Sequence, residues 1–142
     1  MLFTKEEEAG ILQAIRQAEQ ATSGEIRVFV EAFCDRDHPL ERAAEIFHLN
    51  EMYHTKVRNA VLIYVAEKSR MFAIWGDAGI HEKVGYQFWD AEKQLMQTYL
   101  RRGQAAEGIS LVITQIGEQL KHFFPANPAD NENELPDAII YG

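Results

Sequence analysis

The chain has 142 residues, of which 46% are hydrophobic and 25% charged, and its formal net charge is −8. These values fit one soluble domain that buries a core without disulfides or a structural metal. The negative charge disfavours nucleic acid as a partner, because phosphate contacts need clustered basic residues, and here these are scattered apart from Arg101 and Arg102. The longest apolar run, residues 60–66, is far too short to span a membrane.

The start of the chain lacks the basic and apolar regions of a secretory signal, and its single cysteine, Cys34, has no internal disulfide partner. We therefore expect a cytoplasmic protein.

The first half of the chain predicts a helix, a strand and a second helix. Thr4 and Glu7 have capping-box spacing, so a helix begins there and ends at the TSG of residues 22–24. The segment EIRVFVEAF alternates apolar and polar residues, which indicates a strand that begins at Glu25. A helix follows from about Pro39, a residue suited to a first helical turn.

The second half predicts a hairpin and two further helices. Residues 60–66, AVLIYVA, are apolar at every position, as in a central strand covered on both faces. The four-residue turn EKSR joins them to MFAIWG, residues 71–76, as a hairpin. Helical spacing then extends from roughly Glu82 to Arg101 and from about Ala105 to Phe124, with Gly103 between the two helices.

The order of these elements predicts an α/β fold, with a small mixed sheet and helices on both faces. A strand, helix and strand in succession normally form a right-handed crossover with parallel strands, so Glu25 and Asn59 should lie at one edge of the sheet. The hairpin turn sets Ala66 opposite Met71, and a constant register then brings Ala60 opposite Asp77.

Oxygen ligands gather at this expected edge. Glu25 and Asp77 supply carboxylates and Asn59 an amide, while Gly76 and Gly79 free nearby backbone carbonyls. Such oxygens are the ligands of Ca²⁺ and Mg²⁺, so we take these residues as a candidate metal site.

Two other interpretations of the same residues stay open. Asp77 has the position of a helix cap, and Glu25 has Arg27 or Arg58 as an ion-pair partner. If the protein is an enzyme, Arg58 is the residue expected to contact phosphate. A DRDHP turn, with Asp35 and Asp37, follows the first strand, but a solvated turn is the favoured interpretation there.

The chain divides into a domain over residues 1–125 and an acidic tail over residues 126–142. Glu134 and Asp137 of the tail are candidates to lend oxygens to the cation if the tail packs back on the domain. Ala138 to Tyr141 form a candidate edge strand.

With these segments placed, the chain resembles the TPM domain family, whose founding members are a thylakoid lumen phosphatase-like protein, a photosystem repair protein and a modulator of acetylcholine receptors. It is most similar to the short stand-alone bacterial members. The matching stretches are TKEEEAGILQAIRQAEQATSGEIRVFVE, HTKVRNAVLIYVAEKSRMFAIWGDAGIHEKVG, FWDAEKQLM and GQAAEGISLVITQIGEQL.

The resemblance implies a Rossmann-like α/β/α sandwich, an association with divalent cations, notably calcium, and an acid phosphatase activity. It directs attention to Glu25, Asn59 and Asp77, in the segments similar to the family's SGE, RN and GD.

The favoured hypothesis is a module that binds Ca²⁺ or Mg²⁺ and presents a surface to a protein partner. The first alternative is a metal-dependent phosphatase, for which no positioned nucleophile is evident in the sequence. The second is an interaction scaffold without a bound metal.

Overall fold

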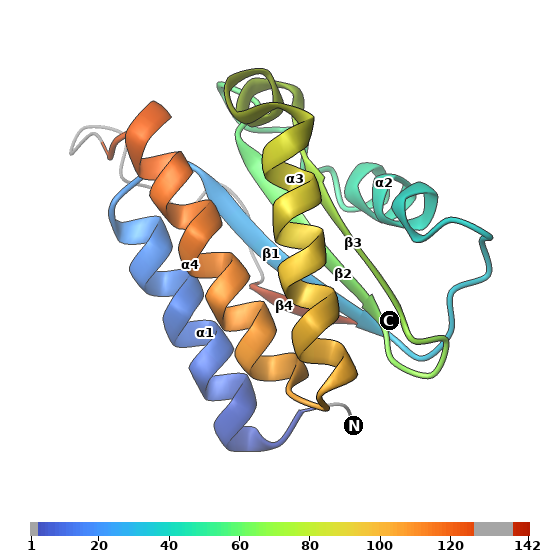
Figure 1. Ribbon diagram of the computed structural model, residues 1–142. Helices are drawn as coiled ribbons and strands as arrows, with labels where there is room; N and C mark the ends of the chain where they lie inside the picture. Colours follow the sequence, from blue (N-terminus) through green and yellow to red (C-terminus); the bar gives the residue numbers. More distant parts are fainter. Residues whose placement is uncertain (1–2, 127–137) are drawn as a thin grey trace.

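The computed structural model describes residues 3–126 and 138–142. Within these residues the chain forms four helices and four strands (Figure 1). In chain order they are α1 (Lys5–Gln20), β1 (Glu25–Glu31), α2 (Pro39–Leu49), β2 (Ala60–Ala66), β3 (Met71–Gly76), α3 (Ala78–Arg101), α4 (Ala105–Phe123) and β4 (Ile139–Tyr141). The structure confirms the α/β class predicted from the sequence.

Local sequence determines where most helices begin. Thr4 and Glu7 form the predicted capping box, with the Glu7 backbone nitrogen 3.0 Å from the Thr4 hydroxyl oxygen. Pro39 opens α2 as expected. The predicted start of α3 near Glu82 is wrong: the helix begins at Ala78, because Asp77 caps it directly after β3.

One break interrupts α3. Gly85 has φ 75° and ψ 173°, values outside the helical region that glycine adopts without steric penalty. The break separates a short first segment, Ala78 to Val84, from the long remainder of the helix. The first segment therefore has its own orientation, which is set by its contacts at the end of β3.

The sheet has the strand order β3-β2-β1-β4 and is mixed. β1 pairs in parallel with β2, and β2 forms the predicted antiparallel hairpin with β3, with Ala66 opposite Met71. β4 adds to the other side of β1 in parallel, so residues 139–141 form the expected edge strand.

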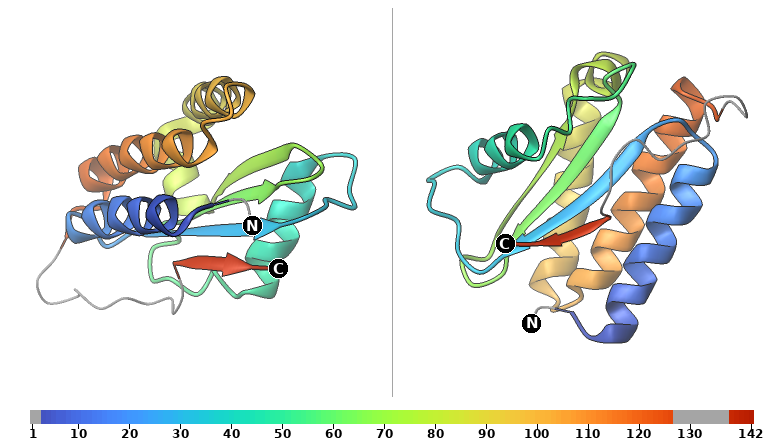
Figure 2. Two further views of the ribbon diagram at one scale, coloured as in Figure 1. Left: turned by 90° about the horizontal axis from the view of Figure 1, so that it is seen from below. Right: turned by 180° about the vertical axis from the view of Figure 1, so that it is seen from behind.

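Helices cover both faces of the sheet. α1, α3 and α4 pack on one face, over a core that includes Ile26, Val28 and Ile63, and α2 packs on the other (Figure 2). The Arg42 guanidinium ties α2 to the end of β1 through Glu31, with nitrogen to oxygen distances of 2.9 and 3.0 Å. No helix in the described part of the chain is long and apolar enough to cross a membrane.

Candidate functional site

The three residues of the predicted metal site lie at one end of the sheet, where β1 and β2 begin and β3 ends. Glu25 is the first residue of β1 and pairs with Ala60, and the Asp77 backbone nitrogen donates to the Ala60 carbonyl oxygen at 3.0 Å. Ala60 therefore lies between the two acidic residues, and Asn59 directly precedes it. The register deduced from the hairpin turn is confirmed. Two strand spacings, about 9.5 Å, separate the backbones of Glu25 and Asp77.

Asp77 is buried and bound by Arg58. Its side chain is 4% exposed, whereas that of Arg58 is 48% exposed. Arg58 Nε lies 2.5 Å from Asp77 Oδ2, and Nη2 lies 2.7 Å from Oδ1, so the pair is bidentate. Hydrogen bonding to Asp77, with the charge of that carboxylate, raises the pKa of the Arg58 guanidinium.

Asp77 is at the same time the N-cap of α3. Its Oδ1 accepts a hydrogen bond from the Ala78 backbone nitrogen at 2.8 Å. The negative side chain at the positive end of the helix dipole is a stabilising arrangement. The structure thus contains the helix cap that the sequence left open as an alternative to a metal. Arg58, a predicted partner of Glu25, is bound to Asp77.

Glu25 is paired with a different arginine. Its Oε2 accepts from Arg27 Nη2 at 3.0 Å, and Arg27 is only 1% exposed. Arg27 Nη1 also donates to Glu19 Oε2 at 2.8 Å and to the Ile26 carbonyl oxygen at 2.7 Å. The sequence did not predict the contribution of Glu19, which lies in α1, the helix before β1.

Asn59 has the most informative environment of the three residues. It is 1% exposed, and its Nδ2 donates to the Ser23 hydroxyl at 3.1 Å, which holds the amide toward the start of β1. Its Oδ1 is buried and has no hydrogen-bond partner within residues 3–126 and 138–142. A buried carbonyl oxygen left in this state is destabilising by about 1–3 kcal/mol unless a water or ion binds it.

The two glycines around Asp77 are required by close packing. A Cβ atom on Gly79 would lie 2.0 Å from the Val57 carbonyl oxygen and 2.7 Å from that of Arg58. On Gly76 it would lie 2.3 Å from the Trp89 ring. Whether carbonyls near Gly76 and Gly79 also serve as metal ligands stays a prediction.

The backbone of Arg58 completes the start of α3. Its carbonyl oxygen accepts from the backbone nitrogens of Gly79 at 2.8 Å and Ile80 at 3.3 Å. These N–H groups lie in the first turn, where no intrahelical acceptor exists. Arg58 adopts φ 56°, in the left-handed region that is unusual for a residue other than glycine.

The donor types suit a hard divalent cation, although the set is small. Within the described residues, no three His, Cys, Asp or Glu side chains form a metal-binding group. Glu25 and Asp77 supply two carboxylates and Asn59 an amide oxygen, and Ca²⁺ or Mg²⁺ complete such sites with carbonyls and waters. Glu134 and Asp137, the further predicted ligands, lie outside the described residues.

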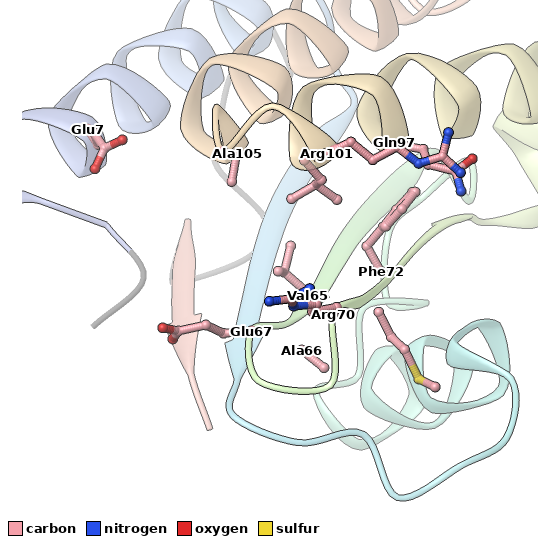
Figure 3. Close-up of a pocket in the computed structure, with 12 residues that line it drawn as sticks. Glu7, Val65, Ala66, Glu67, Arg70, Phe72, Gln97, Arg101 and Ala105 are labelled. Atoms are coloured by element: carbon pink, nitrogen blue, oxygen red, sulfur yellow. The ribbon is translucent and has the colours of Figure 1, made fainter.

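A cavity of about 640 Å³ lies at the opposite end of the hairpin (Figure 3). It is bounded by the β2–β3 turn and the α3–α4 connection, and contains none of the predicted site residues. Arginines and glutamates both line it, at Arg70, Arg101, Glu7 and Glu67, so its charge favours no single class of ligand.

A third buried carboxyl group, Glu92 of α3, was not singled out in the sequence. It is 3% exposed, and burial raises its pKa to about 7. In the sequence, Glu92 is a charged residue among the regularly spaced apolar residues of α3, but helical periodicity alone does not predict that its side chain is buried.

The fold and this strand edge define a small mixed α/β protein with paired acidic residues at one end of its sheet. The TPM domain model matches residues 1–119, and the chain belongs to the TPM domain family. No curated protein matches the sequence.

Two solved structures resemble the chain. The NMR structure of the BA42 protein from the psychrophilic bacterium Bizionia argentinensis is 41% identical, with a TM-score of 0.89, over 99% of this chain and 95% of that one. The N-terminal domain of the cg2496 protein from Corynebacterium glutamicum is 15% identical, with a TM-score of 0.66, over 83% of this chain and 74% of that one. The second likeness is one of fold alone.

Proposed function

We propose that the protein is a divalent-cation-binding module and that Glu25, Asn59 and Asp77 bind Ca²⁺ or Mg²⁺. The observation that carries this proposal is the buried Asn59 Oδ1, an oxygen without a hydrogen-bond partner among the described residues. It belongs to the residue directly before Ala60, which lies between Glu25 and Asp77 in the sheet register. An amide oxygen and carboxylates are ligand types that a hard cation takes.

Cation binding would act on the junction between β3 and α3. Asp77 caps α3, and Arg58 contacts both Asp77 and the first turn of the helix. A ligand held there stabilises the folded state by about 2.7 kcal/mol at a concentration one hundred times its dissociation constant. The ordered junction would then offer a surface to a protein partner.

The experiment is a calorimetric titration of Ca²⁺ and Mg²⁺ into the wild type and Asp77→Asn. Asparagine is also a good N-cap, so this variant keeps the helix start and removes the charge. Asp35→Asn is the matched control, because Asp35 has a 72% exposed side chain far from the site and the charge change is the same.

We expect Asp35→Asn to bind like the wild type and Asp77→Asn to bind at least tenfold more weakly. NMR amide shifts during the titration should concentrate at residues 23–25, 58–60 and 76–80. Equal affinities for the two variants, or shifts confined to other segments, would contradict the proposed site.

A metal-dependent phosphatase is less well supported than a binding module. Arg58, the residue expected to contact phosphate, has both guanidinium hydrogen bonds directed to Asp77. An interaction scaffold without metal would need a water at Asn59 Oδ1, which has no hydrogen-bond partner among the described residues. A cytoplasmic location is part of the proposal, and the single cysteine supports it.

A further inference from the structure

Each carboxylate of the proposed site is neutralised by an arginine. Glu25 pairs with Arg27, which also binds Glu19, and Asp77 pairs with Arg58, so three carboxylates and two arginines meet at this end of the sheet. A divalent cation would add two positive charges next to carboxylates that the arginines already bind. A cation at either carboxylate therefore competes with the arginine that is bound to it.

The two arginines differ in their freedom to withdraw. Arg27 has a side chain only 2% exposed and holds Glu25, Glu19 and a backbone carbonyl together. Moving it would break several buried hydrogen bonds at once. The side chain of Arg58 is 48% exposed, and Asp77 is its one ion-pair partner among the described residues.

The backbone of Arg58 does not need to move with its side chain. The Arg58 carbonyl is held by the Gly79 and Ile80 N–H groups, and Gly79 packs against it without room for a Cβ atom. The main chain is thus fixed by contacts that do not involve the guanidinium. Rotation of the side chain into solvent is enough to uncover Asp77.

Arg58 also occupies the lone pairs that a cation needs. Asp77 Oδ1 accepts from both Ala78 N and Arg58 Nη2, and Oδ2 accepts from Arg58 Nε. Removal of the guanidinium frees one lone pair on each oxygen and removes a positive charge from their immediate surroundings. The guanidinium and the cation therefore exclude each other at Asp77.

We propose that Arg58 is the resident counter-ion of the cation site, and that Ca²⁺ or Mg²⁺ binds by displacing its guanidinium from Asp77 into solvent. This inference rests on the proposed function. Arg58 then regulates affinity: it holds the buried carboxylate in the metal-free protein and weakens cation binding by competition. A bound cation releases Arg58, which becomes an exposed positive group beside the site.

The test compares cation affinity in the wild type, Arg58→Gln and Arg36→Gln. Glutamine is uncharged and does not compete with a divalent cation. Arg36 is the matched control, because its side chain is 40% exposed and ion-paired to Asp35 and Glu45 away from the site. Both substitutions remove one positive charge, so the control reports the general effect of a more negative protein.

We expect Arg58→Gln to bind Ca²⁺ or Mg²⁺ about tenfold more tightly than Arg36→Gln, since release of one bidentate charge-assisted pair is no longer required. If the wild type binds the cation but Arg58→Gln binds it no more tightly than Arg36→Gln, the inference is overturned and the proposed function still stands. Absence of binding in all three proteins would instead refute the proposed function, and the inference with it.

An NMR measurement on the wild type gives a second readout that requires no folded variant. The Arg58 Nε–H group donates to Asp77 in the metal-free protein, so its side-chain resonance should be protected from solvent exchange. Saturation with Ca²⁺ should shift this resonance and speed its exchange. A protected, unshifted Arg58 Nε–H at saturation would show that the guanidinium stays on Asp77 and would overturn the inference.

Discussion

Gly79→Ala tests the contact that joins the first turn of α3 to the backbone before β2. The added Cβ atom would lie 2.0 Å from the Val57 carbonyl oxygen and 2.7 Å from the Arg58 carbonyl oxygen. Both are backbone atoms, so no side-chain rotation relieves the overlap. The first turn must shift, and the hydrogen bonds from Gly79 and Ile80 to Arg58 are lost or lengthened.

The magnitude follows from these contacts. Two backbone hydrogen bonds contribute about 2 kcal/mol together, and steric overlap in a packed site adds about 1–3 kcal/mol. Replacement of glycine by alanine in a helix returns about 1 kcal/mol through propensity. We expect Gly79→Ala to lower the free energy of unfolding by about 2–4 kcal/mol.

Urea denaturation followed by circular dichroism measures this difference. Gly10→Ala is the matched control, because Gly10 lies within α1 and a Cβ atom there meets nothing within 4 Å. That variant should gain about 0.5–1 kcal/mol. A Gly79→Ala variant within about 0.5 kcal/mol of wild type, at equal m-value, would refute the close packing argued for this junction.

Two further predictions concern stability. Burial raises the folded-state pKa of Glu92 to about 7. Because the buried carboxyl resists ionisation, we expect the free energy of unfolding to be highest below pH 4.5 and to fall by up to about 3 kcal/mol as the pH rises toward 7. Glu92→Gln should flatten this part of the pH–stability profile while exposed Glu118→Gln leaves it unchanged; parallel profiles for both would contradict the assignment. Deletion of residues 138–142 removes β4 and its backbone hydrogen bonds to Val28 and Val30, and should lower the free energy of unfolding by about 2–3 kcal/mol in urea titrations, whereas an unchanged midpoint would show that β4 adds nothing.

The elements and their pairing were largely determined by sequence. Each strand was recognised from its own alternation or continuous apolarity, and the four-residue EKSR turn fixed the hairpin register through simple counting. That register alone places Asp77 beside Ala60, as the structure confirms. The hairpin register can be predicted locally, because the turn length and the alternation of side chains along a strand are properties of a short stretch of chain.

The partners of the charged residues were decided only by tertiary structure. The sequence allowed Glu25 either Arg27 or Arg58 as a partner, and the folded chain pairs it with Arg27 while Arg58 binds Asp77. The burial of Arg27 depends likewise on Glu19, brought from α1 to the open edge of β1.

The start of α3 and the burial of Asn59 both depend on segments that come together only in the folded chain. The early start of α3 follows from the Asp77 cap and the Arg58 carbonyl, which come from different strand ends. The sequence marks Asn59 as a candidate ligand, but only the packed sheet encloses its Oδ1 without a hydrogen-bond partner among the described residues. The sequence determines which oxygen-bearing residues lie at this end of the sheet. The burial of Asn59 Oδ1 without a partner among the described residues is decided by tertiary structure, because distant segments must pack together to produce it.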